Sequence, residues 1–245
     1  MNISSIISIT IFAPFITGLI ASMVHVISGP DHLAAVTPLA VERKKRSWLV
    51  GFFWGIGHTL GILIIGILFY FFREILPVDK ISEFSEQLVG IILIVIGLWA
   101  LFRIHSNKWA KSHSHPHIHD KPNKYVHIHN HSHNEIEHHK HSHSDSEKNA
   151  SLSSFLIGIF HGLAGVSHLL AILPTLALPS NYEASSYLLG FGIGTIVAMV
   201  GFSMIIGYVA FKSSENNKTF TFNILKTISG VLAIAVGVFW IIQTF

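Results

Sequence analysis

The chain alternates long apolar blocks with short charged segments. Residues 47–72, 151–182 and 184–211 contain no Asp, Glu, Lys or Arg. Each of these runs exceeds the roughly 20 residues that a helix needs to cross the hydrocarbon core of a bilayer. The pattern therefore predicts about six membrane-spanning helices, which we place near residues 3–27, 47–72, 86–104, 152–175, 184–211 and 221–244.

The apolar pattern continues beyond the end of the first predicted span. Residues 28–41 remain apolar after the pair Gly29-Pro30, which interrupts a helix because proline lacks a backbone N–H and clashes with the preceding turn. We therefore expect a half-helix or a re-entrant segment here. Counted as spans of their own, such pieces would raise the number to seven or eight.

Composition agrees with a membrane protein. Half of the residues are apolar, 12% are charged and the mean hydropathy is +0.55, which is too apolar for a soluble domain of this length. The chain contains no cysteine, so it has no disulfide, no thiolate metal site and no thiol pair for carrying electrons. The net charge of +3 requires no nucleic-acid partner. The lipid bilayer is the expected surrounding.

Basic residues concentrate in three of the connecting segments. They occupy 43–46, recur between 103 and 148 and return at 212 and 218, whereas the opposite connections carry Arg73 and Lys80. The positive-inside rule then places these three segments in the cytoplasm and both termini outside. We expect a multi-pass protein of the plasma (inner) membrane.

The two halves of the chain repeat a pattern of glycines. The triplet Gly55-Ile56-Gly57 matches Gly192-Ile193-Gly194, and Gly90 and Gly97 match Gly230 and Gly237. Glycine is common in all packed membrane helices, but ordered matches favour a true repeat. Two copies of three spans must have opposite orientations, as in many secondary transporters. We predict an all-α polytopic bundle built as two inverted three-helix repeats, with domains 1–104, 105–150 and 151–245.

Paired histidines mark the same place in both halves. The sequences are His25-Val-Ile-Ser-Gly-Pro-Asp-His32 and His161-Gly-Leu-Ala-Gly-Val-Ser-His168, in which Gly29 aligns with Gly165. Imidazole is costly beside lipid, so a duplicated pair indicates a built site, and neutral imidazoles are common metal ligands. We therefore select His25, His32, His161 and His168 as candidate metal ligands.

Helix geometry limits what one pair can bind. On a straight helix His25 and His32 lie about 10 Å apart, too far for one ion with bonds of about 2 Å. A break at Gly29 and Pro30, with a corresponding break at Gly165, removes this limit and lets His25, Asp31 and His32 surround a common point. Asp31 is the one carboxylate inside an apolar block, and it needs a cation or a proton there.

His58 is a further candidate ligand in the second predicted span. Gly51 and Gly55 lie on the same helical face, so this face should pack closely and turn His58 inward. The corresponding position in the second half is Thr195. For His58 or His168 taken alone, a hydrogen-bonded packing role remains an alternative.

The segment 105–150 contains 13 histidines among Ser, Asn, Lys and Glu. It has too few apolar residues to form a core, so we expect disorder. Alternating imidazoles chelate divalent ions, although a solvated spacer is the alternative. The secondary metal-binding positions are His113, His115, His117, His119, His127, His129, His131 and His133.

The first histidine motif, together with Gly57-His58-Thr59 and the His161–His168 echo, resembles the membrane urease-accessory branch of the nickel/cobalt transporter superfamily. The resemblance covers the chain apart from the histidine-rich insert. It implies a multi-pass carrier of Ni²⁺ or Co²⁺ in which His25, Asp31, His32 and His58 match the metal positions. The spacing differs from nickel permeases with His-x4-Asp-His, because five residues separate His25 from Asp31.

Ligand chemistry independently limits the ion. Imidazole with one carboxylate suits Ni²⁺, Co²⁺ or Zn²⁺, whereas Mg²⁺ and Ca²⁺ need more oxygen ligands and Cu(I) prefers sulfur. The leading interpretation is a secondary transporter with no tightly bound cofactor. A metal-binding accessory protein that serves a nickel-enzyme maturation system is the alternative. A membrane metalloenzyme is disfavoured because the sequence lacks His-Glu-x-x-His.

The predicted orientation can be tested with reporter fusions. A reporter placed after Phe245 should be active only outside the cytoplasm, because an even number of spans returns the chain to the side of its N-terminus. A reporter at position 125 in the insert serves as the control and should read as cytoplasmic. A cytoplasmic reading at the C-terminus would contradict the six-span topology.

Overall fold

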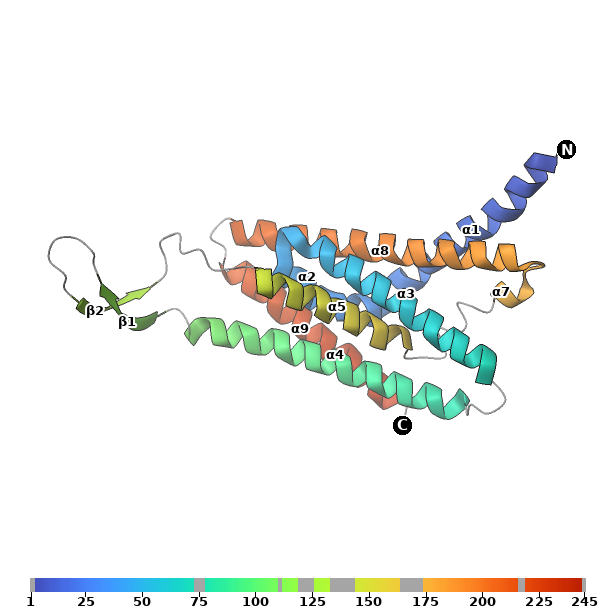
Figure 1. The fold of residues 1–245 in the computed structure, drawn as a ribbon. Helices are drawn as coiled ribbons and strands as arrows, with labels where there is room; N and C mark the ends of the chain where they lie inside the picture. The colour runs from blue at the N-terminus through green and yellow to red at the C-terminus, as the bar shows by residue number, and fades with distance from the viewer. Residues whose placement is uncertain are drawn as a thin grey trace.

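The computed structural model describes residues 3–72, 78–109, 112–118, 126–132, 144–163, 174–215 and 219–243. Most of these residues lie in helices (Figure 1). The elements are α1 (Ile3–Ser28), α2 (Pro30–Arg43), the short 3₁₀ helix η1 (Lys44–Arg46), α3 (Ser47–Phe72), α4 (Val78–Trp109), β1 (Ser112–Ile118), β2 (Val126–Ser132), α5 (Ser144–Leu163), α7 (Pro174–Ala177), α8 (Asn181–Glu215) and α9 (Thr219–Gln243).

The predicted interruption after the first span is present. Helix α1 ends at Ser28, Gly29 has an extended backbone with φ −85° and ψ 103°, and Pro30 begins α2. Proline is favoured at this first helical position because its N–H would lack a partner inside the helix. The segment 30–43 is therefore a separate half-helix.

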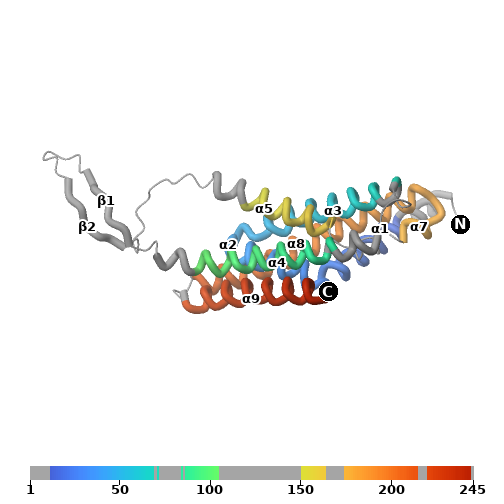
Figure 2. Tube along the Cα trace, turned by 90° about the horizontal axis from the view of Figure 1, so that it is seen from below, coloured from blue at the N-terminus to red at the C-terminus, as the bar shows by residue number. Residues whose placement is uncertain are grey.

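The long helices pack as three close pairs, α1 with α8, α3 with α5 and α4 with α9. Figure 1 and Figure 2 both show α4 beside α9. Glycines form these contacts, because without a Cβ they let backbones touch. Gly158 and Gly162 of α5, for example, lie against the backbone of Trp54 and His58 in α3.

The directions of the helices match alternate crossings of a membrane. Along α3 and α5, Gly57 meets Phe155 and Gly61 meets Ile159, so these two helices are parallel. Along α4 and α9, by contrast, Gly90 meets Gly237 and Gly97 meets Gly230. Residue numbers at these contacts rise along α4 while they fall along α9, so the two helices are antiparallel.

The same contacts reveal a pseudo-two-fold relation between the halves. Gly55 and Gly192 are equivalent positions in the two halves, and the same difference in residue number relates Thr59 to Ile196. The two contacts are exchanged accordingly: Gly55 packs on Ile196, and Gly192 packs on Thr59. The Gly90–Gly237 contact is likewise exchanged with the Gly230–Gly97 contact. Two antiparallel helices that exchange places under a two-fold axis have inverted topology. The structure thus agrees with two inverted repeats in an all-helical bundle.

The exterior of the bundle is apolar, and the chain is a membrane protein. Within the described residues, four segments are long and apolar enough to cross a bilayer: Pro30–Leu68, Glu86–Ile104, Asn181–Ser214 and Phe220–Gln243. The described apolar parts of the first and fourth predicted spans are shorter, Phe12–Ser28 and Ala150–Leu163. Large exposed side chains such as Phe71, Phe102 and Ile242 suit contact with lipid.

The described part of the insert contains two short strands. Strands β1 and β2 pair in antiparallel register, with Ser112 opposite Ser132 and Ile118 opposite Val126. Much of the insert lies outside the described residues, so its disorder stays a prediction. The alternating residues of β1 and β2 have the period of two that a strand requires, a local pattern that overall composition does not capture.

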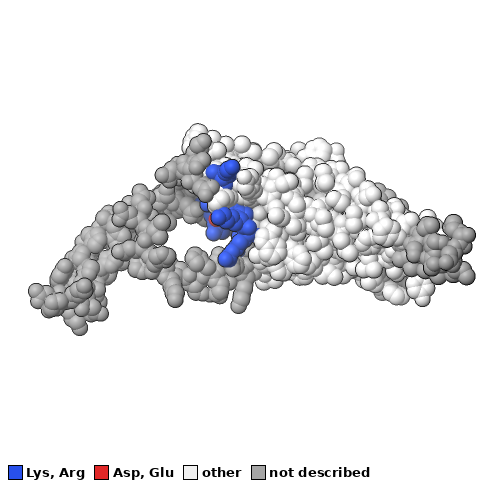
Figure 3. Space-filling view, turned by 90° about the horizontal axis from the view of Figure 1, so that it is seen from above, with Lys and Arg blue, Asp and Glu red and all other residues white. Residues whose placement is uncertain are grey.

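Basic side chains gather at one end of the bundle (Figure 3). They surround the turn from α2 to α3, where Lys44 lies over the ring of Phe222. At the same end, Glu42 of α2 pairs with Arg103 of α4 and with the buried Lys226 of α9. These ion pairs attach the C-terminal end of α2 to the α4–α9 pair.

Replacing Gly158 by alanine should separate α3 from α5. The new Cβ would overlap the backbone carbonyl of Trp54, and overpacking of this kind destabilises proteins by about 1–3 kcal/mol. Thermal unfolding of the purified protein should show a lower midpoint.

The matched control is Gly201→Ala in α8, where a Cβ meets nothing within 4 Å. Both substitutions raise helix propensity by the same amount, so the difference between the two unfolding midpoints measures the packing between α3 and α5. Equal unfolding midpoints for the two variants would contradict the close contact.

Candidate metal centre

Five polar side chains converge inside the bundle. His25 comes from α1, Asp31 and His32 from α2, His58 from α3 and His161 from α5. Exposed fractions of 7%, 2%, 0% and 0% show that Asp31, His32, His58 and His161 are buried, while His25 is half-buried. The cluster therefore joins residues that are far apart in sequence.

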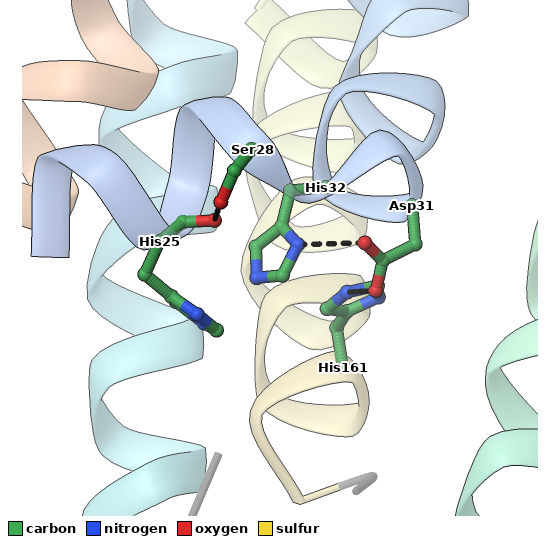
Figure 4. Close-up of polar contacts among 5 residues, drawn as sticks. All are labelled: His25, Ser28, Asp31, His32 and His161. Atoms are coloured by element: carbon green, nitrogen blue, oxygen red, sulfur yellow. Dashed lines mark hydrogen bonds and ion pairs between the residues drawn. The ribbon is translucent and has the colours of Figure 1, made fainter. Parts of the chain in front are cut away.

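The break between α1 and α2 brings the first two histidines together. The ring centroids of His25 and His32 are 4.8 Å apart, whereas a continuous helix would separate the residues by about 10 Å. Ser28 donates a hydrogen bond of 3.2 Å to the carbonyl of His25, which supports the last turn of α1 (Figure 4). The chain then turns at Gly29 and presents His32 toward His25.

Asp31 lies at the centre of a buried hydrogen-bonded set (Figure 4). Its Oδ1 is 2.9 Å from Nδ1 of His32, and its Oδ2 is 3.1 Å from Nε2 of His161. A carboxylate only accepts hydrogen bonds, so both rings donate. Asp31 also lies in the first turn of α2, where the helix dipole stabilises negative charge.

The tautomers defined by these bonds suit metal binding. A neutral imidazole that donates from one nitrogen carries a lone pair on the other. For His32 this second nitrogen is Nε2, and for His161 it is Nδ1. The carboxylate that orients each ring also raises its basicity, as it does for histidines in known metal sites.

In the part of the chain that the structure describes, potential ligand atoms form two groups of three. One group is His25, His32 and His58, and the other is Asp31, His32 and His161; within each, the atoms lie within 4.8 Å of one another. Nitrogen and oxygen bonds to Zn²⁺ are about 2.0–2.2 Å, so adjustments of less than about 1 Å would bring each group round one ion.

Trp54 forms one wall of the cluster, a role that the sequence analysis did not assign. Its ring stacks on His58, with centroids 4.6 Å apart and planes inclined by 14°, and it lies 5.6 Å from His32 and 5.4 Å from His161. Trp54 precedes His58 by one helical turn, the spacing that places both on one face. This spacing is the sequence signal that could have indicated the contact between Trp54 and His58.

The structure brings together His25, Asp31, His32, His58 and His161, but their role as metal ligands stays a prediction. His168 and Gly165 lie outside the described residues. The side chains of the eight histidines selected in the insert also lie outside them. At the position related to His58, Thr195 is buried and donates to the carbonyl of Phe191, so the second half supplies no imidazole there.

The fold and the cluster together define a class, a polytopic membrane helix bundle with histidine and aspartate side chains buried at its centre. A family model described as the cytochrome c biogenesis protein transmembrane region matches residues 13–239, and the chain belongs to this family. The chain has no cysteine and thus no thiol chemistry of its own. Family membership establishes the fold of the chain, and its chemistry has to be inferred from the residues of the site.

Three relatives refine the comparison. "Chloroplast protein FOR GROWTH AND FERTILITY 1" of Arabidopsis thaliana is 30% identical over 94% of this chain, which spans 59% of that protein. "Urease accessory protein UreH" of a Bacillus species is 33% identical over 73% of this chain and 69% of its own. "Putative nickel/cobalt efflux system" of Methanocaldococcus jannaschii is 30% identical over 35% and 42%. No solved structure matches the chain significantly.

These relatives confirm the resemblance stated from the motifs. One relative is named as a urease accessory protein and another as a nickel/cobalt efflux system, and the terms urease accessory and nickel/cobalt both occur in the name of the family branch that the motifs resemble. The chain covers less than two thirds of the chloroplast relative, so that protein's role does not transfer to this chain.

Removing His161 should destabilise the protein through Asp31. The variant His161→Ala leaves a buried carboxylate with one fewer donor, and leaving a buried acceptor without its hydrogen bond costs about 1–3 kcal/mol, or more when the acceptor is charged. The double variant Asp31→Asn/His161→Ala removes the charge as well and should recover at least half of the loss. Unfolding of the metal-free protein measures both effects. A double variant less stable than His161→Ala would contradict this dependence.

Proposed function

We propose that the protein is a secondary transporter of a divalent transition-metal ion, Ni²⁺ or Co²⁺. The observation that carries this proposal is the Asp31–His32–His161 set buried among apolar helices, with His25 and His58 beside it. Ionisable groups inside a membrane protein usually lie on an ion pathway. The inverted repeats suit alternating access to a central site.

The donor set favours borderline metal ions. Four imidazoles and one carboxylate offer mainly nitrogen, which suits Ni²⁺, Co²⁺ and Zn²⁺. Mg²⁺ and Ca²⁺ would require more oxygen ligands. The name of the methanogen relative supports nickel or cobalt over zinc.

Metal binding at this site would be coupled to protons. Asp31 holds the N–H groups of His32 and His161, and a nitrogen or oxygen must lose its proton before it binds a metal. An ion bound together with Asp31 at these same nitrogens, Nδ1 of His32 and Nε2 of His161, would displace their protons, and its departure would let the protons return. This exchange gives the transporter a means of using a proton gradient.

A metal-binding accessory protein is the second candidate. The name of the Bacillus relative and the histidine-rich insert support delivery of nickel to a maturing metalloenzyme. The relatives are named as transport or accessory proteins and not as enzymes, which agrees with a protein that performs no catalysis. For location, we propose the plasma membrane with the basic end of the bundle in the cytoplasm, following the charge distribution.

Cellular metal content tests the transporter directly. Expression of the protein should change the nickel or cobalt content of cells, measured by mass spectrometry of washed cells, and the sign of the change distinguishes uptake from export. The variant His32→Ala should return the content to that of cells without the protein, because His32 belongs to both ligand groups.

The matched control is Gly201→Ala, which should retain full transport because nothing lies near the added Cβ. A variant lacking residues 106–148 separates the insert from the membrane site. If this deletion retains transport and His32→Ala abolishes it, the membrane site is the transporting one. Unchanged metal content with the intact protein would exclude the transporter.

A further inference from the structure

We propose that the ion occupies two overlapping positions in the bundle and passes between them on His32. The first position is formed by His25, His32 and His58, and the second by Asp31, His32 and His161. This inference rests on the proposed function, because it assigns positions to the same transported ion.

The geometry separates the two positions. Each set of three has its ligand atoms within 4.8 Å, but the five residues do not make one such group. Ligand atoms on opposite sides of one ion lie no more than about 4.2 Å apart, twice the metal–nitrogen bond length. A single ion can therefore satisfy one set at a time without a larger rearrangement.

His32 is the common member of both sets, and its ring lies close to the rings of the other three histidines. Its ring centroid is 4.8 Å from that of His25, 5.0 Å from His58 and 4.7 Å from His161. Figure 4 shows its ring between His25 and the carboxylate of Asp31. An ion that moves from one position to the other can keep an imidazole ligand within reach throughout the step.

The two positions depend on different sets of helices. His25 lies on α1, which packs against α8, whereas His58 and His161 lie on α3 and α5, which pack against each other. The first position thus spans both pairs, and the second needs only α2 and α5. A shift of the α1–α8 pair would open the first position and leave the second intact.

Charge and burial give the positions different properties. The first contains three imidazoles and no carboxylate, and it includes the half-buried His25. The second is fully buried and contains the carboxylate of Asp31, which compensates an ion for its lost hydration. The first position is therefore the access position, and the second holds the ion inside the bundle.

Binding of Co²⁺ to the full-length protein in detergent tests this arrangement. The visible absorption of Co²⁺ reports the number and type of its ligands. His58→Ala removes a ligand from the first position alone, His161→Ala from the second alone, and His32→Ala from both. All three variants keep the insert, so the His32→Ala spectrum is the blank for its histidines.

We expect both single variants to bind one Co²⁺ above this blank, with different spectra and affinities within about tenfold of the wild type, a change of about 1.4 kcal/mol. Neither variant should transport. Thr195→Ala is the matched control for truncating a buried polar side chain, since its hydroxyl bonds within its own helix. Its spectrum and transport should equal those of the wild type.

A second variant protects the test against misfolding. If His161→Ala fails to fold, His161→Gln keeps an N–H donor for Asp31 while replacing the imidazole ligand. Co²⁺ bound to the His161→Gln variant should then show the spectrum expected for an ion held by His25, His32 and His58.

The outcomes separate this inference from the proposed function. If His58→Ala or either His161 variant alone lowers binding to the blank, the five residues form one site; the two positions are then disproved and the transporter is not. If wild type and His32→Ala bind Co²⁺ equally and transport equally, the two positions are disproved and transport does not use this site; if neither protein changes cellular metal content, the proposed function fails.

Discussion

Burying the carboxylate of Asp31 inside an apolar bundle is the constraint on which the rest of the site depends. An isolated charge in such surroundings is far too costly to retain. The protein satisfies it with two imidazole donors, one from the neighbouring residue and one from another helix. Because a carboxylate accepts, it also determines which nitrogen of each ring donates and which can bind a metal. Stability and ligand chemistry thus arise from the same contacts.

The position of Asp31 depends in turn on a short half-helix. Gly29 and Pro30 end α1 and begin α2, so that His25 and His32 can approach within one cluster. The other end of α2 carries Glu42, which is tied to α4 and α9. These two ends are separated by about 16 Å of helix. Helix α2 therefore connects the buried cluster to the basic end of the bundle.

Glycine contacts hold this half-helix in a pseudo-symmetric frame. Gly158 and Gly162 bring α5 against α3, which places His161 beside His58 with ring centroids 5.6 Å apart. The helix packing of the two halves is nearly symmetric, but the polar side chains that the two halves supply are not. The first half provides His58 and Asp31, whereas Thr195 occupies the position related to His58. The result is an asymmetric cluster of buried polar side chains within a nearly symmetric helix scaffold.

The sequence by itself determined the membrane class, the repeat and the helix break, because these depend on local hydropathy, spacing and backbone chemistry. It also selected His25, Asp31, His32, His58 and His161, since polar groups in apolar blocks are costly and therefore conspicuous. It could not determine that Asp31 bonds His161, that Trp54 stacks on His58, or that the ligands divide into two groups. Those features depend on how α1, α3 and α5 approach α2 through glycine contacts, and side chains from separate helices meet only when the whole bundle has packed.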